Sequence, residues 1–110
     1  MKETIEEACP VVETIELLGG RYKLLILRAL LYAVAAMRFG ELKQEIQKIS
    51  QKTLTRSLRE LEQTGLLTRT VYPEVPPRVE YELTSAAQEL MPVFLAMKSW
   101  RESHRGPSAG

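Results

Sequence analysis

The segment from Ile49 to Leu67, "ISQKTLTRSLRELEQTGLL", most narrows what this chain can fold into. At about 100° per residue, its apolar residues fall on one narrow stripe of a helix. These residues are Leu54, Leu58 and Leu61. Ser50 is a typical N-cap and Gly65 a typical helix end. The segment therefore predicts an amphipathic helix over about 50–64 whose leucine stripe packs on the rest of a domain.

The opposite face of this helix is polar and mostly cationic. It carries Lys52, Arg56, Arg59 and Gln63, with Thr55 on its flank. Such side chains donate hydrogen bonds to phosphates and base edges, and Arg can bind guanine through two parallel hydrogen bonds. The same residues also fit a solvated surface helix, in which Arg56 pairs with Glu60 and Arg59 with Glu62.

Two strands, Leu66–Tyr72 and Arg78–Leu83, are predicted directly after this helix. In the second strand, apolar residues alternate with charged ones, which is typical of a strand with one buried face. The loop between them contains Pro73, Pro76 and Pro77, which cannot donate to a sheet ladder. A proline that fits its native geometry stabilises the folded loop by about 0.4–1 kcal/mol. We therefore expect a stiff hairpin tip that presents Arg78 at its base with little ordering cost on binding.

The rest of the chain is predicted to be helical. The expected helices run from about Val11 to the Gly19-Gly20 pair, from Arg21 to about Leu31, from Phe39 to about Ile46, and from a cap at Thr84 or Ser85 to about Trp100. Pro92 lies inside the last of these and should kink it. The order predicts a mainly α fold with a small β-hairpin: a winged helix-turn-helix whose turn is formed by residues 47–49.

Length and charge narrow the class of protein. The chain has 110 residues, which predicts one domain over about 9–107, with flexible ends at 1–8 and 103–110. Residues 1–20 hold one Lys and five Glu (−4), 21–37 have charge +3, 38–78 have +3 and 79–110 have −1. Positive charge in the middle of the chain is consistent with a face that binds a polyanion. With a single cysteine and no apolar run near the roughly 18 residues that span a bilayer, we expect a cytoplasmic protein without a membrane segment.

Catalytic and metal-binding motifs are missing from the sequence. His104 is the only histidine and lies near the chain end, so no Cys/His pair is positioned for nucleophilic catalysis. There is no glycine-rich phosphate loop and no spacing typical of metal ligands. We therefore predict that the protein is not an enzyme and needs no cofactor and no metal.

The residues also resemble those of a known family. The stretches "CPVVETIELLGGRYKLLILRALL", "RFGELKQEI", "ISQKTLTRSLRELEQTGLLTRTVYPEVPPRVEYELT" and "LMPVFLAMKSW" are similar to the HxlR-type winged helix-turn-helix transcriptional regulators, relatives of the MarR group in bacteria and archaea. The resemblance covers about Cys9 to Trp100 and is most specific from Ile49 to Thr84. It implies a homodimer that binds double-stranded operator DNA, with helix 50–64 in the major groove and the wing, 72–78, along the backbone or minor groove.

Together, the helix face and the resemblance give a set of expected DNA-binding residues. They are Ser50, Gln51, Lys52, Thr53, Thr55, Arg56, Arg59 and Arg78. The expected dimer interface comprises Val11, Ile15, Leu90, Phe94, Met97 and Trp100, because the resemblance implies that the first and last helices pair the subunits. The alternative is that Phe94, Met97 and Trp100 pack inside one subunit.

Two positions depart from the family pattern. Tyr22 stands where the family usually has Trp. Residues 32–37 are apolar and lack the Gly, Pro or Asp that usually marks a turn there. Either the second helix continues through this segment, or a turn forms without its usual residues, and the first small strand expected near Met37–Phe39 depends on which occurs.

Cys9 and the protein's partners leave further alternatives open. A cysteine in this "CPV" position senses oxidants or electrophiles in several relatives, and a helix N-terminus favours such chemistry. Glu6, Glu7 and Glu13 place negative charge near this thiol, which disfavours such sensing. A lone cysteine is also often a plain small apolar residue. An oxidant or a small-molecule effector is thus left open. A winged-helix protein–protein adaptor is the other reading, but it predicts an apolar or acidic helix 50–64.

Overall fold

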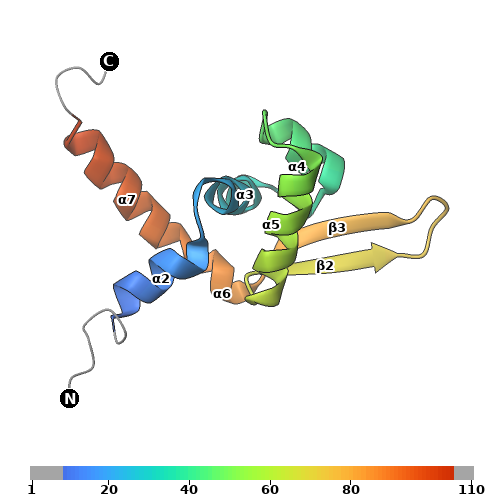
Figure 1. Cartoon of the computed structure of the whole chain (residues 1–110), viewed down its shortest axis with the longest axis horizontal. Coiled ribbons are helices and arrows are strands. Elements are labelled where there is room, and N and C mark those ends of the chain that lie inside the picture. The colour runs from blue at the N-terminus through green and yellow to red at the C-terminus, as the bar shows by residue number, and fades with distance from the viewer. Residues whose placement is uncertain (1–8, 106–110) are drawn as a thin grey trace.

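The structure is a computed structural model that describes residues 9–105. The elements are α2 (Pro10–Leu18), α3 (Arg21–Tyr32), β1 (Met37–Arg38), α4 (Phe39–Glu45), α5 (Gln51–Gln63), β2 (Leu67–Tyr72), β3 (Arg78–Leu83), α6 (Ser85–Gln88) and α7 (Met91–Ser103). The hairpin of β2 and β3 projects from one end of the molecule, and α2 and α7 lie at the other (Figure 1). The predicted mainly helical fold with a hairpin after helix 50–64 is confirmed.

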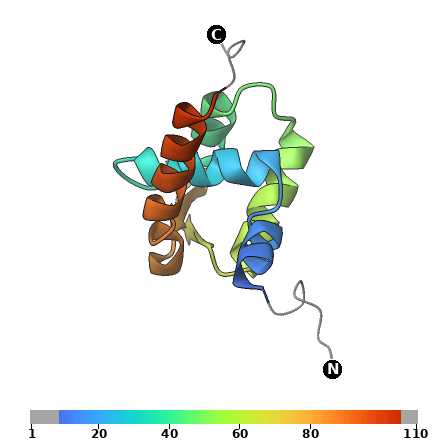
Figure 2. The same cartoon turned by 90° about the vertical axis from the view of Figure 1, so that its left-hand side faces the viewer.

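The leucine stripe of α5 forms the centre of the core. Leu54, Leu58 and Leu61 are at most 2% exposed and pack in one cluster with residues of α3 and α4. These neighbours include Ile26, Leu27, Leu30 and Leu42. Figure 2 shows α3 running across the body of the molecule between α2 and α7. Burial of this stripe fixes which face of α5 points outward.

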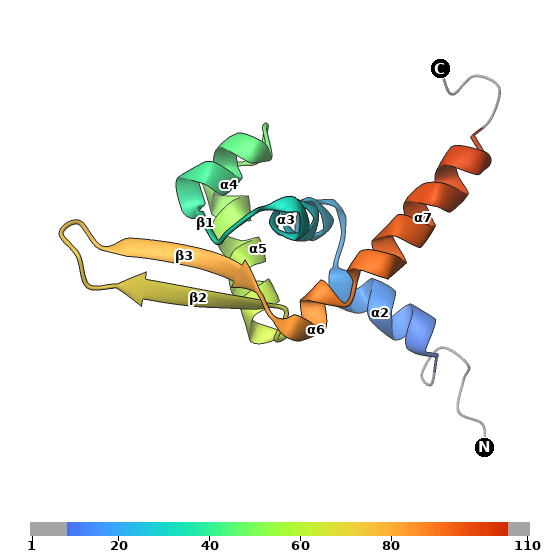
Figure 3. The same ribbon diagram turned by 180° about the vertical axis from the view of Figure 1, so that it is seen from behind.

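The sheet has three antiparallel strands in the order β1-β3-β2. In the hairpin, Leu67 lies opposite Leu83, Arg69 opposite Tyr81, and Tyr72 opposite Arg78. Short strand β1 pairs with the other edge of β3, where Met37 lies opposite Tyr81 (Figure 3). Tyr81 and Leu83 are buried while Glu82 is exposed, so the predicted alternation is confirmed in the second half of β3, whereas its first three residues are all half-buried.

Hydrogen bonds cap both ends of α5, and they lie where the sequence predicted the N-cap and the helix end. The Ser50 hydroxyl accepts the N–H of Thr53 at 3.0 Å. At the other end, Gly65 has φ +82° and the N–H of Leu66 donates to Leu61 O at 3.0 Å. This is a Schellman arrangement, which glycine favours because a left-handed conformation costs it little. It turns the chain directly from α5 into β2.

The prediction of one kinked helix after Thr84 is wrong. Helix α6 ends at Gln88, and α7 begins at Met91 with Pro92 in its first turn. A proline is well accommodated there, because the first N–H groups of a helix have no acceptor within it. The Thr84 cap is confirmed, since its hydroxyl accepts the Ala87 N–H at 3.2 Å.

The segment 32–37 forms a turn rather than a longer helix. Helix α3 ends at Tyr32, Ala33 is extended, and β1 follows at Met37. The expected small strand is therefore present, although Val34 in the turn is fully exposed. At the C-terminus, α7 continues to Ser103, and the His104 ring stacks on Trp100 with centroids 4.7 Å apart. Of the ends predicted to be flexible, 1–8 and 103–110, the structure places Ser103 in α7, and residues 1–8 and 106–110 lie outside the described residues.

Candidate nucleic-acid interface

The outward face of α5 is the predicted polar face. Its exposed residues are Gln51, Lys52, Thr55, Arg56, Arg59 and Gln63, whereas Thr53 is half-buried. The buried residues of the same helix are Leu54, Ser57, Leu58 and Leu61. The two sets lie on opposite sides, so the core holds α5 with its cationic side chains toward solvent.

The helix-turn-helix positions the start of α5. Helix α4 runs from Phe39 to Glu45 and is anchored by buried Leu42, and in the connection to α5 the side chains of Ile46 and Ile49 are buried. Lys48 turns the chain with φ +71°, a conformation that residues other than glycine enter infrequently. The sequence pattern predicted the turn but not this conformation.

The first turn of α5 is exposed beside its cap. Ser50 accepts the Thr53 N–H and donates to the Thr53 hydroxyl, also at 3.0 Å. The N–H groups of the first turn have no acceptor within the helix, and the helix dipole places positive charge there. Gln51 and Lys52 occupy this turn, so its geometry is that of an anion-binding helix terminus.

The alternative of local ion pairs on α5 is not what the structure shows. Among the described residues, no carboxylate lies within 4.0 Å of the basic groups of Lys52, Arg56 or Arg59. Glu60 instead pairs with Lys23 of α3, with 3.1 Å between Nζ and Oε1. The outward face of α5 thus keeps its positive charge.

Arg78 is the first residue of β3, directly after the tip loop, where the sequence predicted it. Its Nε and Nη2 donate to Glu74 Oε2 at 3.1 and 2.8 Å, and its Nη1 donates to Glu80 Oε2 at 2.6 Å. The guanidinium carbon lies 3.8 Å from the centroid of the Tyr72 ring. The hydrogen bond from Arg78 lowers the pKa of Glu74, and the Glu74 and Glu80 carboxylates raise the pKa of Arg78. The DNA-contact role of Arg78 stays a prediction.

A groove between α5 and the hairpin adds a residue that the sequence reasoning missed. It has a volume of about 360 Å³ and is lined by Thr55, Leu58, Arg59, Glu62, Arg69 and Tyr81. Arg69 lies in β2 opposite Tyr81 and lines this groove with residues of α5. The alternation of Leu67, Arg69 and Val71 places Arg69 on one face of the strand, but only the packing of the sheet against α5 brings it into one groove with Arg59.

Similarity to known proteins agrees with this architecture. A profile of the HxlR-like helix-turn-helix family matches residues 17–109. The chain belongs to this family. It is 43% identical over 99 residues to the HTH-type transcriptional regulator YdeP of Bacillus subtilis, covering 90% of this chain and 76% of YdeP.

Solved structures of MarR-family and redox regulators superpose on this fold. A MarR-family protein from Porphyromonas gingivalis superposes with a TM-score of 0.80 at 33% identity, covering 96% of this chain and all of that one. The redox regulator HypR in its oxidized form gives 0.77 at 41% identity, covering 89% and 99%. This chain therefore has the fold and the family membership of DNA-binding transcriptional regulators.

The predicted dimer residues divide into two groups. Val11, Ile15, Met97 and Trp100 are 53–65% exposed. Phe94 and Leu90 are half-buried and pack against the core, so internal packing accounts for Phe94 but not for Met97 or Trp100. A groove of about 440 Å³ separates α2 from α7, and it is lined mostly by apolar side chains. The predicted interface stays a prediction.

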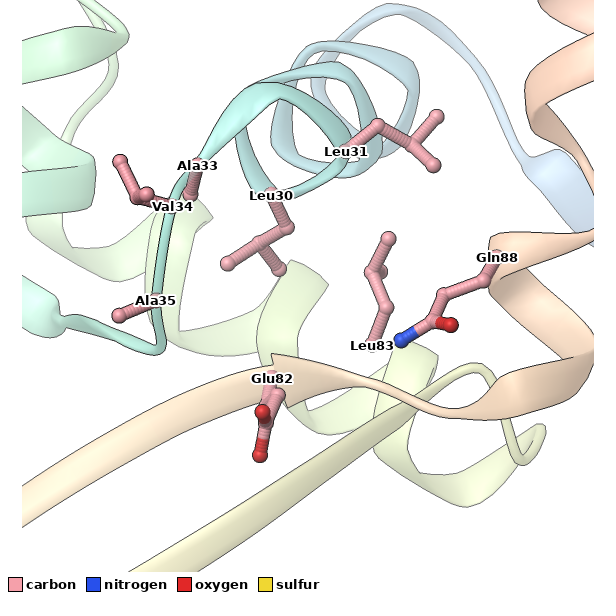
Figure 4. A pocket seen from close by; sticks show the side chains of 8 residues that line it. All are labelled: Leu30, Leu31, Ala33, Val34, Ala35, Glu82, Leu83 and Gln88. Carbon is pink, nitrogen blue, oxygen red and sulfur yellow. The ribbon is translucent and has the colours of Figure 1, made fainter.

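Within the described residues, neither Cys9 nor the hollow beside β3 forms a built ligand site. Cys9 is half-buried and is the N-cap residue of α2. A hollow of about 180 Å³ lies between the end of α3 and β3; Glu82 points away from it, and the Gln88 amide lies near Leu83 (Figure 4). Within residues 9–105, no cluster of three metal-ligating side chains occurs. In the same part of the chain, no helix is long and apolar enough to cross a membrane.

Proposed function

We propose that this HxlR-like protein binds a specific double-stranded DNA sequence through α5 and regulates transcription from that site. The observation that carries the proposal is the unpaired cationic face of α5. Lys52, Arg56 and Arg59 project outward from a rigid helix, and no described carboxylate lies within 4.0 Å of their basic groups. Such a face fits the major groove, where Arg and Lys read base edges.

In this proposal, the residues of the outward face of α5 and the residues at its start have different roles. Lys52, Thr55, Arg56 and Arg59 face the bases and the flanking backbone. Ser50, Gln51 and Thr53 bring the helix start to a phosphate, which the positive end of the helix favours. Arg78 belongs to the wing, which lies on the backbone or minor groove.

The functional unit in this proposal is a homodimer. Four large apolar side chains at the end opposite the wing are more than half exposed: Val11, Ile15, Met97 and Trp100. A second copy of the chain would cover them by packing on α2 and α7. Two-fold symmetry then requires inverted half-sites about one helical turn apart or a multiple, at roughly 10–10.5 base pairs per turn.

The adaptor alternative is not favoured, because the exposed face of α5 is cationic rather than apolar or acidic. A redox role for Cys9 is a second candidate, supported by its position at the start of α2 and by the likeness to the redox regulator HypR. We also infer that the protein acts in the cytoplasm and is not an enzyme.

The test is to select genomic DNA fragments with the purified protein, with and without an oxidant. We expect a small set of enriched fragments containing inverted repeats. Loss of enrichment on oxidation in the wild type but not in Cys9→Ser would support sensing by Cys9. No enrichment under either condition would contradict the proposed function.

A further inference from the structure

The wing hairpin carries more negative than positive charge. Residues 67–83 contain Arg69 and Arg78 against Glu74, Glu80 and Glu82, a net charge of −1. A hairpin of this composition does not attract the DNA backbone as a whole. Any contact with a phosphate therefore depends on where each arginine points.

Arg78 is already hydrogen-bonded to two carboxylates of its own hairpin. A guanidinium has five N–H donors, and Glu74 and Glu80 together occupy three of those of Arg78. Its side chain is 24% exposed and lies over the Tyr72 ring. A phosphate that approached the remaining N–H groups would meet the two carboxylates, and like charges at close range repel.

The surroundings of Arg69 differ from those of Arg78 in exposure and in charge. It is exposed, and within residues 9–105 no carboxylate lies within 4.0 Å of its guanidinium nitrogens. It shares the groove of about 360 Å³ with Arg59 of α5 and Thr55, whose hydroxyl is a further donor. Glu62 also lines this groove, so the groove holds two positive charges and one negative charge.

We propose that Arg69, not Arg78, is the phosphate contact of the wing, and that it shares one backbone phosphate with Arg59 in the groove between α5 and β2. This inference rests on the proposed DNA-binding function. Two guanidiniums from different elements suit a phosphate, because each presents a planar set of donors to its oxygens. Arg78 then braces the hairpin and does not touch DNA.

The test is the salt dependence of binding to a selected duplex and to a random duplex of equal length. Each neutralised phosphate contributes about 0.9 to the slope of log K against log salt. We expect R69Q to lower the slope on both duplexes by only part of this 0.9, because Arg59 remains on the same phosphate, and R69K to preserve the slope. R78Q should keep the wild-type slope, and R101Q, on α7 away from the groove, is the matched control.

The double variant R59Q/R69Q tests whether the phosphate is shared. If both side chains hold one phosphate, its slope should fall by about 0.9 in total; a fall of about 1.8 would overturn the shared site. An unchanged slope for R69Q, or a loss of about 0.9 for R78Q, would overturn the assignment of Arg69. Wild-type protein that binds no duplex would instead refute the proposed function.

Discussion

Arg78 holds a single oxygen of Glu74 with two hydrogen bonds, from Nε at 3.1 Å and from Nη2 at 2.8 Å. This pair joins the start of β3 to the loop that precedes it. The second carboxylate, Glu80, holds the same guanidinium from within β3. The tip end of the hairpin is therefore held by charge as well as by the β-ladder, and this relationship gives the first prediction.

The Glu74–Arg78 pair should make the wing sensitive to acid. The hydrogen bond from Arg78 lowers the pKa of Glu74 below its ordinary 4.5, and the charges of Arg78 and Arg38 act in the same direction. A lowered folded-state pKa contributes stability that is complete above the unfolded value and is lost as pH falls through the folded value. We therefore expect the pair to be intact at pH 4.5 and above, and to break only as the pH falls through the lowered pKa of Glu74.

This titration is measured by NMR, from the Glu74 carboxyl carbon and the Tyr72 ring protons. Both should change with one midpoint below the ordinary pKa of a glutamate. In R78Q the Glu74 midpoint should rise toward that ordinary value. An identical midpoint in wild type and R78Q would show that Arg78 does not set the pKa of Glu74.

Ser50 should stabilise the fold as the cap of α5. Because its hydroxyl accepts the N–H of Thr53, Ser50→Ala leaves that donor without a partner. We expect the free energy of unfolding to fall by about 1 kcal/mol, and by only a few tenths in Ser50→Gly. Urea denaturation measures both, with Ser85→Ala in the exposed first turn of α6 as control. Equal stability of wild type and Ser50→Ala would refute the capping role.

The exposed apolar residues of α2 and α7 should hold the dimer together. Ile15 and Met97 line the groove between these helices and are 64% and 53% exposed. A charge at either position would have to be buried in the interface, so I15D and M97D should sediment as monomers at micromolar concentration. V34D changes an exposed valine outside this groove and should sediment as the wild type does. Dimers that survive both I15D and M97D would place the interface elsewhere.

The prolines of the wing tip should limit the ordering cost of DNA binding. Replacing Pro76 and Pro77 with glycines gives the exposed loop more conformations to lose on binding. We expect lower DNA affinity together with a lower thermal midpoint of unfolding, because each proline also stabilises the folded loop, and intermediate effects when both become alanine. Affinity equal to wild type in the double glycine variant would show that rigidity of the loop does not contribute to DNA binding.

The parts of the fold that follow from local pattern were predictable from the sequence. The spacing of Leu54, Leu58 and Leu61 sets the two faces of α5, and the alternation in β3 sets its buried side. The break before α7 was not predictable, because Pro92 is compatible with either a kinked helix or the first turn of a new one. The turn at 33–36 has no glycine or proline and forms where Met37 pairs with Tyr81.

The candidate site shows the same division between local and tertiary information. Exposure of Lys52, Arg56 and Arg59 follows from helical periodicity alone. The partners of Arg78 depend on how the loop folds back, and the surroundings of Arg69 depend on how the sheet packs against α5. The one-dimensional pattern therefore singled out Arg78, which is already paired, and missed Arg69, which is not.

The most direct test of sequence-specific recognition by α5 is the binding of Arg56→Ala to the selected operator and to random DNA. Arg56 is exposed on the outward face, and no described carboxylate lies within 4.0 Å of its guanidinium nitrogens. We expect operator binding to weaken by about 1–3 kcal/mol, with preference relaxed at one base position and random binding changed much less. An unchanged operator affinity, or an equal loss on both DNAs, would contradict base recognition by this face.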